Sequence, residues 1–272
     1  MKNQKFGFIG IGNMASAIIA GILKSGKFAP EQICMYNPHP EKMERFVQSG
    51  CIAYPSASAL AKDCGVIFLC VKPQIFPVVL DEIKPAIQNS PSGDILFVSI
   101  AAGITFKNLQ DALGDARPYV RAMPNTPLLL GEGATALSRT SNVSDEVFSL
   151  IFDIFSCCGI AREIPEEQID AIISVSGSSP AYLYMLAQIT CAYAEQHGID
   201  PKTALDLFCQ TMKGSADMLV NSGKDPQSLI DMVTSKGGTT FRLLGVLKDR
   251  DINGIMMDAF AACEKRAKEL SM

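Results

Sequence analysis

The start of the chain combines a short apolar strand, a glycine-containing turn and the beginning of a helix. Residues 5–18 read KFGFIGIGNMASAI, in which Gly10, Gly12 and Ala15 follow an apolar run. Such a run is typical of a buried parallel strand. In the dinucleotide-binding fingerprint the first glycine makes a tight turn, the second lets the backbone approach a pyrophosphate, and the third position seats the helix. The pattern therefore predicts a Rossmann-type start, with a phosphate at the helix N-terminus.

The composition is that of a globular protein and argues against several classes of partner. The chain has 272 residues, 48% of them hydrophobic, which is enough for one large domain or two smaller ones. A net charge of -4 without a lysine or arginine cluster argues against nucleic acid or an anionic membrane as a partner. Because we find neither a secretory signal nor an apolar run of membrane-spanning length, we expect no membrane association.

The nine cysteines and two histidines show no pattern typical of a metal site or a disulfide framework. None of the cysteines is spaced as Cys-x-x-Cys, and several, including Cys70 and Cys191, lie among apolar residues. The two histidines are far apart and belong to no ligand motif. We therefore expect reduced and mostly buried thiols, a cytoplasmic location and no metal.

Strands and helices alternate as far as residue 164. Further strands are expected at 33–37, 51–54, 66–71, 94–101, 119–123, 134–138 and 160–164, and helices at 14–23, 40–49, 57–62, 77–88 and 145–157. This alternation predicts a doubly wound parallel sheet with helices on both faces, and 134–138 is expected as an edge strand. The loop Lys72-Pro73-Gln74 follows a buried strand and is held extended by its proline. We expect it at the carboxyl edge of the sheet, where such folds bind ligands.

The end of the second strand bears on the choice of dinucleotide. NAD enzymes often place a carboxylate there to bind the ribose 2′-hydroxyl, whereas this chain has Asn37, Pro38 and His39. Without an acid to repel a 2′-phosphate, NADPH is favoured over NADH, although the arginine that often accompanies NADPH is missing here. A plain turn at Asn37 and Pro38 is the alternative.

From Pro165 onward the pattern contains helices only. The helical segments are 166–197, 201–222, 226–234 and 240–269, with breaks at Gly177, Pro180, Gly198, Pro201, Gly223 and Gly238. We therefore expect a dinucleotide-binding domain at 1–164 and an all-helical domain at 165–272. The helices are rich in Ala, Leu, Met and Phe, and such helices bury more than one face. This predicts a homo-oligomer, with a monomeric helical cap as the alternative.

Two polar stretches interrupt the helical half, SVSGSSP at 174–180 and TSKGGTT at 234–240. Glycine costs about 1 kcal/mol and proline about 3 kcal/mol in a helix interior, so each stretch is expected to break a helix. Amides and hydroxyls gathered at 237–240, just before a helix, predict a site for a small carboxylate. N-capping by Thr239 or Thr240 alone is the alternative.

Six motifs taken together resemble the pyrroline-5-carboxylate reductase family. They are GFIGIGNMASAI at 7–18, CVKPQ at 70–74, SIAAG at 99–103, RAMPNTP at 121–127, SGSSPAY at 176–182 and SKGGTT at 235–240. They follow the family's order and cover essentially the whole chain. The resemblance implies an oxidoreductase of proline biosynthesis, which reduces 1-pyrroline-5-carboxylate to L-proline with NADPH, or alternatively NADH. It also implies a homodimer, or a higher oligomer of dimers, with interlocked helical domains.

The resemblance also assigns residues to the cofactor and the substrate. Those that would contact the pyrophosphate are Gly10, Gly12, Asn13, Met14 and Ala15, and Asn37 would lie at the adenosine ribose. Those that would lie along the dinucleotide are Val71, Lys72 and Pro73, and those that would border the nicotinamide are Ala101, Gly103, Met123, Pro124 and Asn125. The substrate loop matches Ser235, Gly237, Gly238, Thr239 and Thr240. In this loop the hydroxyl of Thr240 would meet the ring nitrogen.

The substrate loop departs from the family pattern at four positions. The family usually has proline where this chain has Lys236, and small residues where it has Phe241, Arg242 and Leu243. Lys236 and Arg242 would either strengthen carboxylate binding, alter substrate choice or point to solvent. These positions bear on substrate identity more than on reaction type.

The residues offer no Ser-His-Asp or Cys-His pair for nucleophilic catalysis, and the motif loops contain few general acids. A cyclic imine that arrives protonated requires only a hydride at its ring carbon. We therefore expect catalysis by placement, which contributes about 7 to 11 kcal/mol. The hydroxyl of Thr240 would add a hydrogen bond of about 1.5 to 3 kcal/mol.

Two other functions are compatible with the same residues. A related Rossmann reductase of another cyclic imine or of a β-hydroxyacid is the first, and for a hydroxyacid Lys213 or Lys236 would have to serve as the lysine of the helical domain. A non-catalytic nucleotide-sensing protein, which keeps the cofactor pocket while its substrate loop has diverged, is the second. Measurable NADPH binding without turnover of any imine would support the sensor.

Overall fold

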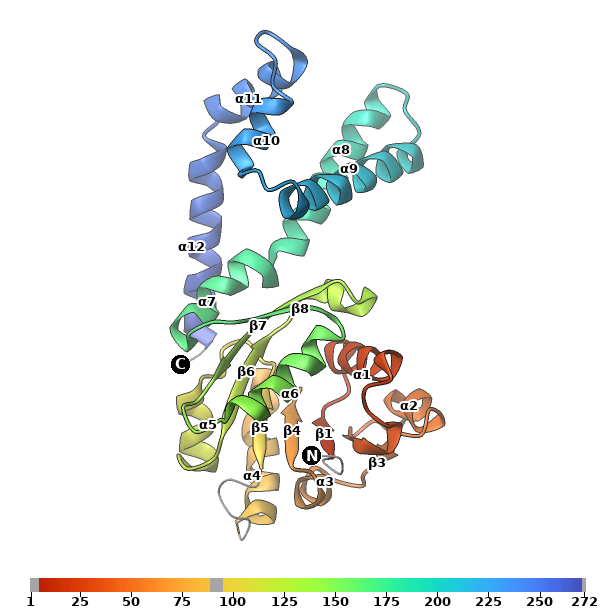
Figure 1. Ribbon diagram of the computed structural model, residues 1–272, viewed down its shortest axis with the longest axis vertical. Helices are drawn as coiled ribbons and strands as arrows, with labels where there is room; N and C mark the ends of the chain where they lie inside the picture. Colours follow the sequence, from red (N-terminus) through yellow and green to blue (C-terminus); the bar gives the residue numbers. More distant parts are fainter. Residues whose placement is uncertain (1–4, 89–94, 271–272) are drawn as a thin grey trace. The chain divides into compact units, whose positions relative to one another are not determined.

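The computed structural model describes residues 5–88 and 95–270 (Figure 1). The chain forms two compact units, Met1–Ser178 together with Cys263–Met272, and Ser179–Ala262. The described sheet lies entirely in the first unit, and the second consists of helices and their connections. The functional division between residues 164 and 165 stays a prediction.

An eight-stranded sheet forms the centre of the first unit, with strand order β3-β2-β1-β4-β5-β6-β7-β8. The bounds are β1 Phe6–Ile9, β2 Ile33–Tyr36, β3 Ile52–Ala53, β4 Val66–Leu69, β5 Leu96–Ser99, β6 Tyr119–Met123, β7 Gly133–Arg139 and β8 Gly159–Glu163. Every pair is parallel except β6 with β7. The predicted Rossmann-type fold is confirmed, and the strand order reverses between β1 and β4, the kind of point at which such sheets bind ligands. Of the strand expected at 94–101, Asp94 lies outside the described residues.

The predicted parallel sheet has one antiparallel strand, and the expectation that residues 134–138 form an edge strand is wrong. β7 runs antiparallel to β6 and lies inside the sheet, with β8 at the edge. The connection from β6 to β7 contains only the short 3-10 helix η4 (Thr126–Leu130). A parallel crossover needs about a dozen residues or more, so this connection returns the chain in the opposite direction.

The helices of the first unit largely follow the predicted pattern. They are α1 Asn13–Ser25, α2 Glu44–Gln48, α3 Ala57–Asp63, α4 Phe76–Ile87, α5 Phe106–Leu113, α6 Asp145–Ser156 and α7 Ile169–Ile172, with 3-10 turns η1 Pro30–Gln32, η2 Pro40–Lys42, η3 Pro73–Ile75 and η5 Glu166–Gln168. Our prediction omits α5. The signal was present, because Thr105 forms a capping box with Asn108, whose amide donates to Thr105 Oγ1 at 3.1 Å.

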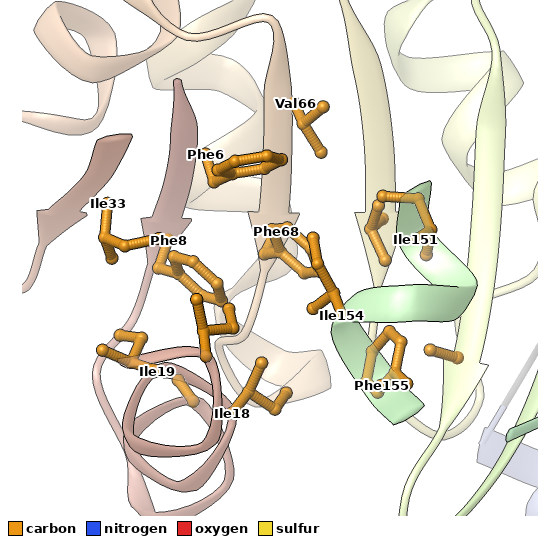
Figure 2. Close-up of a cluster of buried hydrophobic side chains, with 14 of the residues drawn as sticks. Phe6, Phe8, Ile18, Ile19, Ile33, Val66, Phe68, Ile151, Ile154 and Phe155 are labelled. Carbon is orange, nitrogen blue, oxygen red and sulfur yellow. The ribbon is translucent and has the colours of Figure 1, made fainter. Parts of the chain in front are cut away.

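Apolar side chains fill the space on both faces of the sheet. On one face Phe8 stacks on Phe68 with ring centroids 4.4 Å apart, and Phe68 packs against Phe155 of α6 (Figure 2). Ile18 of α1 is fully buried in the same cluster. The cluster on the other face includes Leu60 of α3, Ile83 of α4 and Leu109 of α5. Helices packed on both faces hold the strands in register and fix the loops at the strand ends.

The second unit contains α8 (Ser179–Gln196), α9 (Pro201–Asn221), α10 (Pro226–Met232), α11 (Thr239–Asp249) and most of α12 (Ile252–Leu270). The segment expected to be helical at 240–269 consists of two helices, because the chain turns at Asp251, whose φ is +52°. Asp251 Oδ1 then accepts a hydrogen bond from the Gly254 amide at 3.1 Å, inside the first turn of α12. No helix within the described part of the chain has the length and apolarity needed to cross a membrane.

The predicted helix break at residues 174–180 takes a different form. Residues Ile173–Gly177 form a π-helical turn, η6, between α7 and α8. Pro180 lies in the first turn of α8, where its missing N–H costs no helical hydrogen bond. The glycine and proline therefore widen and restart the helix, and the chain remains helical through most of the stretch.

An ion pair between a buried arginine and a partly exposed glutamate connects the sheet to α5. Arg121 of β6 is 3% exposed, and its Nη1 donates to Glu166 Oε1 at 2.9 Å. The amide of Phe106, at the start of α5, donates to the same carboxylate oxygen at 2.7 Å. One carboxylate therefore balances the charge of a buried guanidinium and accepts a hydrogen bond from an amide that has no partner within its own helix.

We expect Glu166→Gln to lower the free energy of unfolding by about 2 to 3 kcal/mol, because it leaves the charge of Arg121 buried without a counterion. Glu167→Gln, at the exposed neighbouring position, is the control and should change stability by less than about 0.5 kcal/mol. Urea unfolding at one fixed protein concentration measures both. Equal stability of the two variants would contradict the structural role of the ion pair.

Candidate active site

The fingerprint turn has the geometry that dinucleotide binding requires. Gly10 has a φ of +92°, and a Cβ there would lie 2.6 Å from the side chain of Val71 and 3.1 Å from its amide nitrogen. Only glycine fits this approach of two loops. At Gly12 a Cβ would meet nothing within 4 Å, so the backbone faces open space. Gly12 is also the N-cap of α1 and offers no side-chain cap, which leaves the first amides of the helix for a ligand.

The remaining predicted pyrophosphate residues divide into two groups. Asn13 lines the pocket beside the turn. Ala15 is 1% exposed and packs into the core beneath the sheet, as expected of the residue that seats the helix. Met14 is half-buried against the same core. The structure therefore gives Ala15 and Met14 packing roles, and a contact between either of them and a pyrophosphate stays a prediction.

Asn37 ties the fingerprint turn to the end of β2. Its Oδ1 accepts a hydrogen bond from the Ile11 amide at 3.0 Å, and its Nδ2 donates to the carbonyl of His39 at 3.1 Å. The amide of Gly10 donates to the carbonyl of Tyr36 at 2.9 Å, beside this link. Asn37 is 8% exposed. Its side chain therefore holds two loops together, a role that the sequence did not reveal.

A pocket of about 660 Å³ opens beside the fingerprint turn. Its lining residues are Ile11, Gly12, Asn13, Ser16, Glu41, Lys42, Glu44, Arg45, Gln48 and Leu129. Gly12 and Asn13 were predicted to contact a dinucleotide, whereas the cations Lys42 and Arg45 were missed. Both lie in the segment after β2 that was recognised only as a short helix. Open backbone at Gly12, amides of the first turn of α1 and two cations suit a phosphate-bearing ligand.

The residues predicted along the dinucleotide lie in two places. Val71 packs against Gly10 at the fingerprint turn, and Lys72 is exposed. Pro73 lines a second pocket, of about 360 Å³, together with Leu270 at the end of α12 and with Gly103, which was predicted to border the nicotinamide. A Cβ at Gly103 would lie 2.7 Å from the carbonyl oxygen of Leu270. This glycine therefore makes room for the end of α12, a reason for the residue that is separate from cofactor binding.

The residues predicted to border the nicotinamide lie at the carboxyl ends of β5 and β6. Ala101, Met123, Pro124 and Asn125 are all buried. Asn125 Oδ1 accepts a hydrogen bond from the Ala134 amide at 2.9 Å, and its Nδ2 donates to the carbonyl of Ser176 at 3.0 Å. Asn125 therefore connects the loop after β6 with β7 and with the π-helical turn. This contact gives the SGSSPAY motif a structural role within the first unit.

The predicted substrate loop lies in the second unit, at the start of α11. Gly237 has a φ of +75°, and the Gly238 amide donates to the carbonyl of Ser235 at 3.0 Å. Gly238 is the N-cap and provides no side-chain cap, so N-capping by Thr239 or Thr240 is wrong. Thr240 is half-buried in the first turn. The amides of this turn are therefore available to an anion, as the sequence predicts.

The four residues that depart from the family pattern lie at the surface. Lys236, Phe241, Arg242 and Leu243 are exposed.

All nine cysteines are free thiols, four of them buried and Cys209 exposed, so the expectation of mostly buried thiols is only partly met. Burial raises the pKa of the Cys70 thiol well above its usual range, which keeps this neighbour of the fingerprint turn protonated. The described residues contain no cluster of three or more His, Cys, Asp or Glu that could hold a metal ion.

Comparison with protein families matches both halves of the chain. Residues 166–270 match the family described as pyrroline-5-carboxylate reductase dimerisation. Residues 5–103 match the family described as NADP oxidoreductase, coenzyme F420-dependent. The first match begins close to the predicted boundary at 165, and the second contains the fingerprint turn.

Individual proteins match over nearly the whole chain. Pyrroline-5-carboxylate reductase of Escherichia coli is 39% identical over 98% of each chain. The crystal structure of Plasmodium falciparum pyrroline carboxylate reductase with NADP bound superposes with a TM-score of 0.90 at 31% identity, covering 100% of both chains. The pyrroline-5-carboxylate reductase of Coxiella burnetii superposes with a TM-score of 0.90 at 33% identity, covering 99% of both chains. This chain therefore belongs to the pyrroline-5-carboxylate reductase family.

Proposed function

We propose that this protein reduces 1-pyrroline-5-carboxylate to L-proline with NADPH. The observation that carries the proposal is the full-length family match together with the open glycine turn at Gly10 and Gly12. When bound, NADPH would give up a hydride from its dihydronicotinamide ring to the imine carbon, and the C=N π pair would become the lone pair of the nitrogen, which already carries its proton. Both substrate and product are small carboxylates, which suits the amides at the start of α11.

We assign the roles of the protein residues separately in each unit. In the first unit, Gly12 and Asn13 would bind the pyrophosphate at the N-terminus of α1. Asn37 would hold the fingerprint turn in place through its hydrogen bond with the Ile11 amide. In the second unit, Ser235, Gly237, Gly238 and Thr239 would bind the substrate carboxylate, and Thr240 would orient the ring nitrogen. Residues 165–272 would then form the substrate-binding and dimerisation domain. The main contribution to the rate would come from holding the reactants in place.

The exposed apolar surface of the second unit supports a homodimer or a higher oligomer of dimers. α8 alone exposes Leu183, Tyr184, Met185, Leu186, Ile189 and Tyr193 by more than a third. α10 and α11 contain no buried residue. A monomer would leave this apolar surface in water, so burial between copies is favoured. The nine free thiols suit the reducing cytoplasm.

The first experiment follows NADPH and NADH oxidation with 1-pyrroline-5-carboxylate, 1-pyrroline-2-carboxylate and a β-keto acid. We expect rapid turnover with the first substrate alone and faster turnover with NADPH than with NADH. Turnover of only one of the other substrates would instead identify a related reductase. Nucleotide binding without any turnover would contradict the proposed activity and favour a nucleotide sensor.

Substitution of Thr240 tests its assigned role. Thr240→Ala should lower kcat/KM by about 10- to 100-fold, because it removes one charge-assisted hydrogen bond to the iminium. Thr240→Ser keeps the hydroxyl and should stay within about threefold of the wild type. Thr211→Ala, in which an exposed hydroxyl of α9 is removed, is the control. Near-normal activity in both Thr240 variants would show that the hydroxyl has no such role.

The oligomer can be tested on the exposed side of α8. Ile189→Glu places a charge on a side chain that is 57% exposed in the single chain, and it should shift sedimentation from an oligomer to smaller species if α8 is covered by a second copy. Val78→Glu, on the 66% exposed Val78 of α4, is the control and should leave the sedimentation unchanged. A monomeric wild type in sedimentation velocity would refute the oligomer.

A further inference from the structure

The loop between β5 and α5, residues 100–105, is held at its far end by two charged residues that the predicted site does not include. The loop carries Ala101 and Gly103, which are predicted to border the nicotinamide. We propose that Arg121 and Glu166 are positioning residues for hydride transfer, because together they fix the end of this loop. The inference rests on the proposed function, since it requires the nicotinamide of NADPH at this loop.

The end of the loop is bound by one carboxylate oxygen. Oε1 of Glu166 accepts hydrogen bonds from the Phe106 amide at 2.7 Å and from Nη1 of Arg121 at 2.9 Å. Phe106 is the first residue of α5, so its amide has no partner within the helix. The side chain of Arg121 is 4% exposed, whereas that of Glu166 is 31% exposed. The arginine is therefore the fixed side of the link, and it holds a carboxylate that could otherwise turn toward water.

The start of the loop lies beside the same arginine. Ser99, the last residue of β5, is opposite Arg121 in the register of the two parallel strands. Ser99 is 1% exposed, and its Oγ accepts a hydrogen bond from the Ala101 amide at 3.3 Å. In the middle of the loop, Gly103 has a φ of +80° and lies against the carbonyl of Leu270. The loop is thus bound at its start, middle and end, and the ion pair provides the last of these contacts.

β6 connects the ion pair to the predicted nicotinamide border. Arg121 and Met123 are two residues apart in the strand, so their side chains lie on the same face of the sheet. Met123 is 7% exposed, and Ala102 of the loop packs against the cluster that contains it. A shift at the end of the loop would therefore disturb this packing beside the predicted place of the ring. Hydride transfer is sensitive to such a shift, because a misplacement of about 1 Å can slow a reaction by about 100-fold.

Stability alone is a weak reason for this pair of residues. Nη2 of Arg121 is buried and has no hydrogen-bond partner among the described residues. A buried donor without a partner is costly, and apolar residues of similar volume often replace a buried charge and its counterion without loss of stability. Loss of the counterion alone is strongly destabilising, because the other charge stays buried. Stability and positioning can therefore be separated by removing both charges at once.

The test compares Glu166→Leu with the double variant Glu166→Leu/Arg121→Met. The single variant leaves the guanidinium buried without a counterion, so removal of the arginine as well should restore much of the lost stability to urea. Both variants should nevertheless have a kcat at least about tenfold below that of the wild type, because neither offers an acceptor to the Phe106 amide. The Kd for NADPH should stay within about threefold, since the pyrophosphate site at Gly12 is unchanged.

Two further measurements report on the loop and on hydride transfer. Hydrogen exchange at the Phe106 amide should be at least about tenfold faster in both variants than in the wild type. The kinetic isotope effect on kcat, measured with NADPH deuterated at C4 of the nicotinamide, should increase as hydride transfer becomes rate-limiting. Arg121→Met alone should also lower kcat, whereas Arg121→Lys keeps the charge and a donor and should stay within about threefold of the wild type.

Arg117→Met is the matched control for the loss of a buried arginine. Arg117 is 7% exposed, and its guanidinium donates to the carbonyls of Leu113 and Ile87 at the ends of α5 and α4. It precedes the amino end of β6, whereas the predicted nicotinamide border lies at the carboxyl end. This variant should lose stability to urea and keep kcat within about twofold of the wild type.

Three results would overturn the positioning role. They are a double variant that regains kcat together with stability, an equal loss of kcat in Arg117→Met, and an unchanged exchange rate at the Phe106 amide. With an active wild type, each of these results refutes the positioning role alone. A wild type that reduces no imine refutes the proposed function and the positioning role together.

Discussion

The hydrogen bond from the Ile11 amide to Asn37 Oδ1, 3.0 Å long, fixes the part of the molecule on which the candidate cofactor site depends. Asn37 is 8% exposed, so its side chain makes its bonds with little competition from water. A buried amide left without partners is costly, and this gives the turn and the loop after β2 one strongly preferred arrangement. The positions of η2 and α2, and of the charges they carry, follow from that arrangement.

A second constraint comes from the sheet. The strand order reverses between β1 and β4, and the loops that leave these two strands meet where Gly10 approaches Val71. The buried Phe8 and Phe68 stack on one another in the same two strands and hold them together below this point. The stacked rings hold β1 and β4 together, and Gly10 allows the loops that leave these two strands to approach each other. The backbone at Gly12, which follows β1, is open at this point, where the strand order reverses and such folds bind a dinucleotide.

The sequence was sufficient for the strands and for most helices because apolar runs and breaks by glycine and proline are local signals. It was insufficient where a neighbour in space decides. The antiparallel β7 follows from a short connection after β6, and the two bonds of Asn37 join residues from different loops. The sequence does not reveal Lys42 and Arg45 as pocket residues, because they follow the strand end by several residues and a turn of 3-10 helix brings them to the pocket.

The helical unit poses a different physical problem. Its buried residues are few and mostly small, among them Ala187, Ala194 and Ala204, while α10 and α11 bury none. Folding requires enough apolar burial to offset the loss of chain entropy, and α8 to α11 do little of this within one copy. If a second copy supplies that burial, assembly stabilises the very turn that begins α11. The candidate substrate loop would then depend on the oligomer for its conformation. Burial of the apolar surface of α8 would in this way contribute to substrate binding.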